Sequence, residues 1–255
     1  MCEESTLCFG SPEESRKASV IHHQMATLIL VRHGQSTWNA ANRFSGWVDV
    51  PLSHVGRQEA MQAAEKISFY RIDVCFTSLL VRAIETTAIC LTEGSGASRR
   101  KSPVFKHDSD DPNWHGWDQY EGYIEEEIPI FMSPALDERY YGRLQGFNKA
   151  EMAEKFGQDI VHQWRRSFDV RPPGGESLKD TAARTIPFFQ NRILKHLTNG
   201  DNVLVSAHGN SLRSILMYLD NLSPEEVPSL ELATGIPIVY EIDAEANIID
   251  KVILD

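Results

Sequence analysis

Residues 27–34 read Thr-Leu-Ile-Leu-Val-Arg-His-Gly, an apolar run that ends on an arginine, a histidine and a glycine. A second apolar run, Val203–Ala207, ends in a similar way on His208 and Gly209. Short apolar runs that stop at a glycine are typical of buried strands. We expect these two strands to pair, so that each one delivers a histidine to a turn at the same edge of a sheet.

Apolar runs of strand length alternate along the chain with segments of helical period, which favours an α/β domain. We expect a mainly parallel central sheet with helices on both faces. The expected strands are Thr27–Val31, Asp73–Thr77, Val203–Ala207, Ile238–Ile242 and Ile249–Leu254.

The helical segments begin and end at recognisable capping residues. The first starts at the N-cap Ser53 and runs to about Tyr70, with Val55, Ala60, Ala64 and Ile67 on its buried face. The others cover Leu79–Leu91 closed by Gly94, Asn148–Phe156, Gln158–Phe168, Ser177–Leu197 kinked at Pro187 and ended at Gly200, and the residues after Ala207 through Leu219.

The 255 residues are enough for one large domain with a sizeable core. We expect residues 1–26 to be a flexible N-terminal extension and residues 27–255 to form the catalytic domain. The first 26 residues hold four glutamates and no apolar core of a signal peptide. No apolar stretch reaches the roughly 20 residues of a membrane span, so we expect no membrane partner.

The cysteine pattern bears on the compartment. Cys2, Cys8, Cys75 and Cys90 show neither the spacing of metal ligands nor that of a disulfide framework. We therefore expect a reducing, cytoplasmic environment.

The negative charge of the chain is concentrated in one segment, Lys106 to Ile128. This segment holds eight acidic residues and one lysine, and so carries −7 of the net charge of −11. We expect an acidic insertion at about residues 106–130, peripheral to the site because its charge would repel an anionic substrate. No basic stripe that could follow a phosphate backbone is present, so we expect no nucleic-acid partner.

A metal site within the acidic segment is an alternative hypothesis. Its potential ligands are His107, Asp108, Asp110, Asp111, His115 and Asp118. They lack the one-three-five spacing and the central glycine of a calcium loop. The aromatic Trp114, Trp117 and Tyr120 are more typical of an exposed loop held to the surface by its rings, so we expect no metal.

The two histidines suit phosphoryl chemistry, because one can attack phosphorus while the other stabilises the charge that develops there. Arg32 and His33 follow a strand at the end where open α/β sheets bind ligands. Positive neighbours lower the pKa of His33 and so keep a lone pair free near neutral pH. A structural histidine beside a surface arginine is the alternative for either histidine alone, and the repetition at His208 argues against it.

Further cationic residues predict a phosphate-binding pocket. Arg82 lies at the start of a helix, where backbone N–H groups and the helix dipole favour an anion. Arg165 and Arg166 are adjacent, and guanidinium groups bind phosphate oxygens in bidentate geometry. Taken in isolation, such a pair is better explained by a solvated helix face. Asn39, Ser45, Gly46 and Lys149 add neutral donors and one point charge.

Glu138 is the candidate general acid and base. Moving a phosphoryl group between hydroxyls needs a group that takes and returns the hydroxyl proton. Burial would raise the pKa of Glu138 and the arginines would lower it, and the sequence leaves this balance open. A plain surface carboxylate is the alternative.

Several separate motifs within residues 27–242 resemble those of one family. They are Arg32-His33-Gly34-Gln35-Ser36-Thr37-Trp38-Asn39, Asn42-Arg43-Phe44-Ser45-Gly46-Trp47, Thr77 to Ala83, Leu136 to Lys149, Trp164-Arg165-Arg166, Ala207 to Arg213 and Thr234-Gly235-Ile236-Pro237. By these motifs the chain resembles the cofactor-dependent phosphoglycerate mutases of the histidine phosphatase superfamily. The resemblance implies that His33 is the phosphorylated nucleophile and that Glu138 is the proton donor and acceptor.

The resemblance also implies the surroundings of these two groups. Arg32, Arg82 and His208 would line the transferred phosphoryl group. The phosphoglycerate would be held by Asn39, Ser45, Gly46, Tyr141, Lys149, Arg165, Arg166, Gly209 and Asn210. The implied activity is the interconversion of 3-phosphoglycerate and 2-phosphoglycerate, primed by 2,3-bisphosphoglycerate and without a metal, in a homodimer or homotetramer.

Three departures from the family pattern concern the rim of the implied site. Gln35 and Ser45 stand where glutamate and threonine are common. The segment between Arg82 and Glu138 is longer than usual, and the one between Arg171 and Glu176 is short. Two other functions remain as alternatives, a histidine phosphatase in which water reaches the phosphoenzyme, and a non-catalytic module that binds phosphoglycerate.

Overall fold

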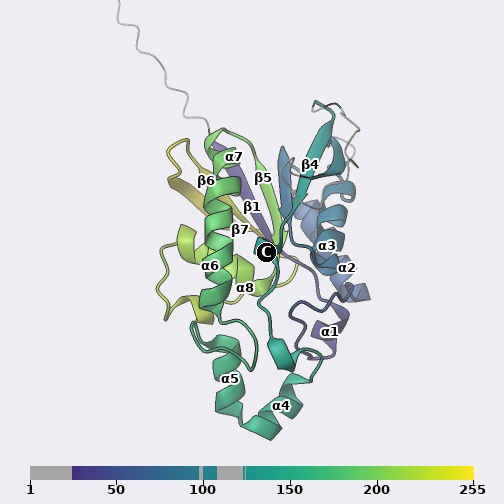
Figure 1. Ribbon diagram of the computed structural model, residues 1–255. Coiled ribbons are helices and arrows are strands. Elements are labelled where there is room, and N and C mark those ends of the chain that lie inside the picture. The colour runs from purple at the N-terminus through teal and green to yellow at the C-terminus, as the bar shows by residue number, and fades with distance from the viewer. Residues whose placement is uncertain (1–24, 98–99, 108–122, 124) are drawn as a thin grey trace, which may run out of the picture.

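A mixed sheet lies at the centre of the protein in the computed structural model, which describes residues 25–97, 100–107, 123 and 125–255 (Figure 1). Within these residues seven strands follow the order β3-β4-β2-β5-β1-β6-β7. Their bounds are β1 Ala26–Arg32, β2 Val74–Thr77, β3 Ser102–Lys106, β4 Glu127–Met132, β5 Val203–Ala207, β6 Pro237–Ile242 and β7 Ile248–Ile253. The strands from β3 to β1 are parallel and β6 is antiparallel to both of its neighbours, which confirms the mainly parallel sheet.

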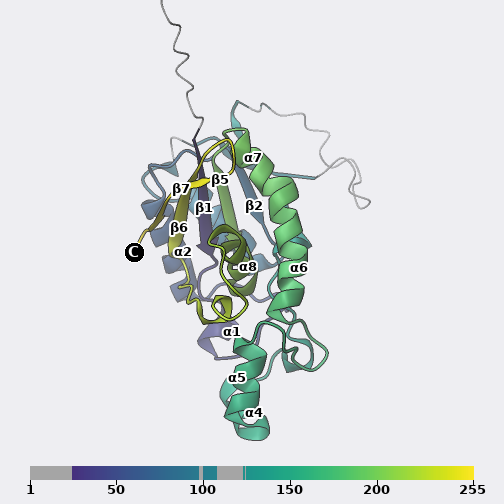
Figure 2. The same ribbon diagram turned by 90° about the vertical axis from the view of Figure 1, so that its left-hand side faces the viewer.

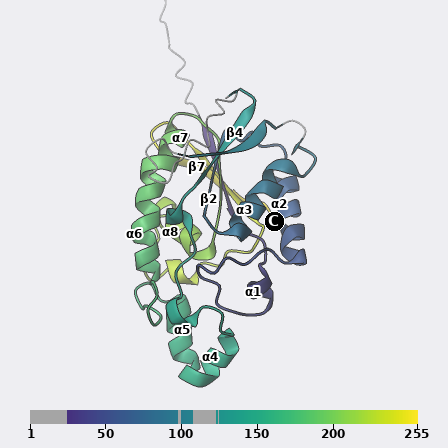
Figure 3. The same ribbon diagram turned by 45° about the vertical axis from the view of Figure 1, so that its right-hand side comes forward.

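Helices cover both faces of the sheet, with α2 and α3 on one face and α6, α7 and α8 on the other (Figures 2 and 3). The α-helices are α1 Thr37–Ala40, α2 His54–Lys66, α3 Val81–Thr92, α4 Lys149–Phe156, α5 Gln158–Arg166, α6 Leu178–Phe188, α7 Leu194–Thr198 and α8 Gly209–Leu219. Short helical turns are η2 Pro134–Leu136, η3 Gly142–Leu144, η4 Phe189–Ile193 and η5 Val227–Ser229.

The alternation of side chains along β1 divides the core into two layers. Leu28 and Leu30 pack with the residues of α6 to α8, whereas Ile29 and Val31 pack with those of α2 and α3. Because successive residues of a strand point to opposite faces, a strand buried on both sides is apolar throughout. This explains why the strand at Thr27–Val31 could be recognised as a continuous apolar run.

The predicted pairing of the two histidine-bearing strands is confirmed. β1 and β5 pair in parallel with Arg32 opposite Ala207, and His33 N–H donates to Ala207 O at 3.0 Å. The carboxyl ends of both strands therefore lie side by side, and the two histidines that follow them meet at one edge of the sheet.

Most of the helix boundaries predicted from the sequence agree with those of the structure to within four residues. Ser53 caps α2 by accepting from Gly56 N–H, and Gly94 follows α3 with a φ of 83°. The long helix expected over Ser177–Leu197 is α6, a π-helical turn just after Pro187, and α7. Proline has no N–H to donate within the helix, and a π-helical turn is one of the local irregularities found where a helix is interrupted.

One predicted core position is wrong. Val55 is 47% exposed, whereas Gly56, Ala60, Ala63 and Ala64 form the buried stripe of α2. α2 packs against α3, and small residues allow that close approach. The buried face thus begins at the glycine, one residue later than the apolar pattern indicated.

The expected extent of the acidic insertion is also wrong at its end. Glu127–Met132 forms β4, which lies inside the sheet between β3 and β2, with Ile128 and Ile130 buried. Residues 127–130 therefore belong to the core and not to a peripheral loop. The predicted N-terminal extension, residues 1–26, is too long at its end, because Ala26 begins β1 and is fully buried. Residues 1–24 and the candidate metal ligands from Asp108 to Asp118 lie outside the described residues.

β7 forms one edge of the sheet, and all six of its residues are exposed. Within the described part of the chain, no helix has the length and apolar character needed to cross a membrane.

Candidate functional site

A polar pocket lies at the carboxyl ends of the parallel strands and is lined in part by residues of α4 and α5. These two helices form a lobe beyond the sheet (Figure 1). The lining of the pocket includes every residue predicted for the site except His208, which is fully buried against His33. The lining residues are Arg32, His33, Asn39, Arg43, Phe44, Ser45, Gly46, Arg82, Glu138, Tyr141, Lys149, Arg165, Arg166, Gly209, Asn210, Arg213 and Glu231.

His33 is held with one ring nitrogen available. Its Nδ1 lies 2.7 Å from Gly34 O, and a carbonyl can only accept, so Nδ1 carries the proton and Nε2 keeps the lone pair. Burial, followed by the charges of Arg82 and Arg32, holds the pKa of His33 well below its usual value. The ring is therefore neutral at physiological pH, and Nε2 can act as a nucleophile.

The turn after His33 requires glycine. A Cβ added at Gly34 would lie 2.1 Å from Gly56 O, because the turn approaches the first residues of α2. This close approach fixes the backbone that carries His33 against α2.

His208 faces His33, with ring centroids 4.8 Å apart. Its Nε2 lies 2.7 Å from Ser78 Oγ, which also accepts the Leu80 N–H at 3.1 Å. The Ser78 hydroxyl can donate to Nε2, and in that tautomer His208 Nδ1 carries the proton. That nitrogen is buried and has no partner in the protein, so it can donate to a ligand oxygen.

Arg82 shapes the pocket wall and brings a buried positive charge to it. Its guanidinium donates to Gly46 O at 2.7 Å and to Val48 O at 3.0 Å. Burial lowers the pKa of Arg82 to about 10, a shift that Glu138 opposes, so it stays protonated at neutral pH. α3 presents this arginine from its first turn, as the position of Arg82 in the sequence predicted.

The carboxylate of Glu138 lies in the pocket and is heavily hydrogen-bonded. Oε1 accepts from Arg139 N–H at 2.7 Å and from the Asn210 side-chain amide at 2.8 Å. Burial alone would raise the pKa of Glu138, but these two hydrogen bonds and the charges of Arg82 and Arg32 lower it overall. The balance that the sequence left open therefore favours the ionised form.

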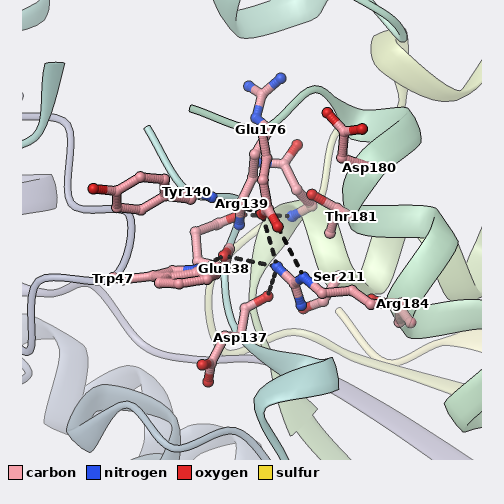
Figure 4. Close-up of polar contacts among 12 residues, drawn as sticks. Trp47, Asp137, Glu138, Arg139, Tyr140, Glu176, Asp180, Thr181, Arg184 and Ser211 are labelled. Carbon is pink, nitrogen blue, oxygen red and sulfur yellow. Dashed lines mark hydrogen bonds and ion pairs between the residues drawn. The ribbon is translucent and has the colours of Figure 1, made fainter. Parts of the chain in front are cut away.

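The backbone that carries Glu138 is anchored from the opposite side by Arg184 of α6 (Figure 4). Arg184 donates to the carbonyl oxygens of Pro134, Ala135, Asp137 and Glu138 at 2.9–3.0 Å and forms an ion pair with Glu176 at 3.1 Å. Trp47 Nε1 donates to the same Glu138 O at 2.6 Å. One guanidinium thus fixes the whole segment that precedes the carboxylate.

The lower wall of the pocket comes from the lobe of α4 and α5. Arg139, fully buried, donates to Tyr141 Oη and to Arg165 O, both at 3.0 Å, and so links the Glu138 segment to the end of α5. Burial would raise the pKa of Tyr141, but Arg139 lowers it overall. Burial also lowers the pKa of Lys149.

Sequence reasoning missed four pocket residues and two supporting ones. Arg43, Phe44 and Arg213 lay within quoted motifs but received no role, and Glu231 was not considered. Ser78 and Arg184 act through other residues, and no local pattern marks such contacts. Among the described residues, no group of three or more histidine, cysteine or carboxylate side chains is placed to hold a metal ion.

Comparison with known sequences identifies the family. The sequence pattern of the histidine phosphatase superfamily (branch 1) matches residues 28–103 and 121–253. The chain belongs to the histidine phosphatase superfamily. The unmatched residues 104–120 fall largely within the acidic segment.

Two relatives place this superfamily member more closely. It is 62% identical over 232 residues to the 2,3-bisphosphoglycerate-dependent phosphoglycerate mutase of Gloeothece citriformis, which covers 90% of this chain and 100% of that protein. It is 61% identical over 230 residues to the 2,3-bisphosphoglycerate-dependent phosphoglycerate mutase 1 of Gloeobacter violaceus, which covers 90% and 99%.

Solved structures share the fold of this superfamily member. A structure titled mycobacterial hydrolase 1 superposes with a TM-score of 0.67 at 22% identity, over 90% of this chain and 96% of that one. At this level of identity the similarity concerns the architecture alone.

Proposed function

We propose that this histidine phosphatase superfamily member interconverts 3-phosphoglycerate and 2-phosphoglycerate through a phosphorylated His33. The observation that carries the proposal is the meeting of His33 and His208 in a pocket with Arg32, Arg82 and Glu138. The identity of about 60% to two curated mutases supports the same activity.

The pocket supplies the groups that phosphoryl transfer needs, which are mainly positioning and positive charge. His33 Nε2 attacks phosphorus and the bond from phosphorus to the substrate oxygen breaks. Arg32, Arg82 and the unpartnered Nδ1 of His208 would surround the oxygens of the transferred group. His208 thereby stabilises charge without becoming the nucleophile.

Glu138 manages the proton of the accepting hydroxyl. As an ionised carboxylate, it takes this proton when the hydroxyl oxygen attacks phospho-His33. A bound phosphate group adds negative charge beside Glu138 and raises its pKa, which allows Glu138 to return the proton to a leaving oxygen in the reverse step. In the pocket without ligand the pKa of Glu138 is lowered, so Glu138 is ionised and can act as the base before it acts as the acid.

The residues fit 2,3-bisphosphoglycerate as the primer. Arg32 Nε, Ser45 Oγ and His208 Nδ1 are buried without a hydrogen-bond partner, and phosphate oxygens would accept from such donors. Arg165, Arg166, Lys149 and Arg213 provide further positive charge for a second anionic group. The primer supplies the phosphoryl group that His33 carries.

The test combines isomerisation with labelling of the protein. Purified enzyme should convert 3-phosphoglycerate to 2-phosphoglycerate, depend on catalytic 2,3-bisphosphoglycerate and incorporate acid-labile phosphate. His33→Gln should lower kcat by at least about 10³-fold and abolish the label, as expected for loss of a nucleophile. Release of inorganic phosphate faster than isomerisation would assign a phosphatase instead, and binding without turnover would assign a binding module.

We further propose a homodimer or homotetramer that acts in the cytoplasm. The support is the resemblance to the mutases and the cysteine pattern. Sedimentation of a monomer at micromolar concentration would contradict the assembly, and recovery of the protein from a membrane or secreted fraction would contradict the compartment.

A further inference from the structure

Three consecutive residues in the connection before β6, Leu230 to Leu232, each contact a different arginine of the pocket. Arg213 Nε donates to Leu230 O at 2.9 Å, and Arg32 Nη1 donates to Leu232 O at 2.6 Å. Between them, Glu231 Oε1 lies 2.6 Å from Arg166 Nη2. Glu231 also lines the pocket itself.

The contact made by Glu231 differs in kind from the other two. Leu230 and Leu232 use backbone carbonyls, which carry partial charge and move only with the chain. Glu231 uses a side-chain carboxylate that is 74% exposed, whereas the Arg166 side chain is 25% exposed. An ion pair this exposed is weak and exchanges readily for a better anion.

The charge of Glu231 opposes that of the pocket. Within the lining described above, Glu138 is the other carboxylate, and it is engaged by Asn210 and Arg139 N–H. Arg166 has one further contact, Nη1 with Pro228 O at 3.3 Å. A ligand anion that uses Arg166 must therefore displace the Glu231 carboxylate or accept its repulsion.

We propose that Glu231 is a specificity-determining residue, which occupies Arg166 in the free enzyme and selects against ligands of high negative charge. This inference rests on the proposed function and deepens it. Coulomb repulsion scales with ligand charge, so Glu231 weakens 2,3-bisphosphoglycerate more than it weakens 3-phosphoglycerate. The residue thereby keeps the doubly phosphorylated primer from saturating the pocket at the expense of the substrate.

The test is the binding of three ligands to Glu231→Gln by calorimetry. Glutamine keeps the size and removes the charge. In a His33→Gln background, which blocks transfer, we expect 3-phosphoglycerate to bind about three- to fivefold more tightly, as removal of a weak competing ion pair implies. The gain for 2,3-bisphosphoglycerate should exceed this, and the gain for inorganic phosphate should be smaller.

A matched control separates a local effect from a change in net charge. Glu245→Gln removes the same charge from an exposed turn that follows β6. This turn lies near the amino end of β1, whereas the pocket lies at its carboxyl end. Its affinities for all three ligands should equal those of the parent. In the His33 enzyme, Glu231→Gln should also lower the KM for 3-phosphoglycerate and increase inhibition by excess 2,3-bisphosphoglycerate.

Three results would overturn the inference. Weaker binding by Glu231→Gln would mean that Glu231 orients Arg166 for the ligand. Unchanged binding would mean that the ion pair is a surface contact without effect. An equal gain for both organic ligands would remove the selectivity. The binding of 3-phosphoglycerate and inorganic phosphate is measured without turnover, so these outcomes are distinct from a failure to isomerise phosphoglycerate.

Discussion

At the scale of single residues, the pocket depends on groups that touch no substrate. Arg184 holds four carbonyls of the segment that ends at Glu138, and Trp47 holds the last of them from another side. A carboxylate that must exchange a proton with a bound hydroxyl has to be positioned within a fraction of an ångström. We therefore regard Arg184 as a positioning residue for Glu138.

Arg184→Lys should lower kcat while changing the KM for 3-phosphoglycerate by less than threefold. Lysine keeps the charge beside Glu176 but cannot reach four carbonyls, so we expect kcat to fall by about 10- to 100-fold. The pH dependence of kcat should also shift, because the surroundings of Glu138 change. A loss confined to thermal stability, with kcat and its pH profile intact, would show that Arg184 is only structural.

Asp137 should make stability fall as pH rises. It is buried and accepts the Leu79 N–H at 2.9 Å, and burial raises its pKa from 3.8 to about 6 despite that bond and Arg184. A folded-state pKa above the unfolded value means that the folded protein holds the proton more tightly. The stability due to the protonated carboxyl is thus present below about pH 4 and is lost by about pH 6.

Asp137→Asn removes this titration and keeps an oxygen for the Leu79 N–H. The difference in unfolding free energy, variant minus parent, should become more positive by about 1–2 kcal/mol between pH 4.5 and pH 7. Urea unfolding at both pH values measures it. A difference that stays constant with pH would place the pKa of Asp137 in its ordinary range.

At the scale of elements, strands buried on both faces could be predicted from the sequence and the strands around the acidic segment could not. β1 and β5 are mostly apolar runs without proline, whereas β3 and β4 carry Pro103 and Pro129 and lie beside acidic residues. Proline lacks the N–H that a central strand donates and therefore argues against one. Here the partner strands supply enough pairing for β4 to lie between β3 and β2.

The bounds of β3 and β4 give a sharper test of the acidic segment. Replacing residues 108–124 by a short flexible linker keeps every residue of both strands. We expect kcat to stay within about threefold of the parent, because a segment this acidic would repel an anionic substrate if it lay at the site. Extending the replacement to residue 130 removes four of the six residues of β4 and should prevent stable folding. A folded 108–124 variant with activity lower by orders of magnitude would show that the segment belongs to the site.

At the scale of the whole molecule, the site unites residues that are far apart in the chain. The parallel pairing of β1 and β5 brings together His33 and His208, which lie 175 residues apart. Residues attached to strand ends could be assigned from the sequence because the fold rule for parallel sheets places those ends together. Arg184 and Glu231 could not be assigned from the sequence. Their contacts depend on how α6 and the connection before β6 pack, and neither segment carries a motif at these positions.

The exposed edge at β7 bears on how the protein behaves at high concentration. An edge rich in Ile249, Val252 and Ile253 invites pairing with a second strand and, eventually, aggregation. A twofold axis that passes through Asp250 or through Lys251 would set that residue against its own copy, whereas an axis between the two would set Asp250 against Lys251. Like charges directly opposite destabilise a strand pair. The two charged residues thus oppose the registers in which either one faces its own copy, and the register that sets Asp250 against Lys251 is the one left for pairing between copies.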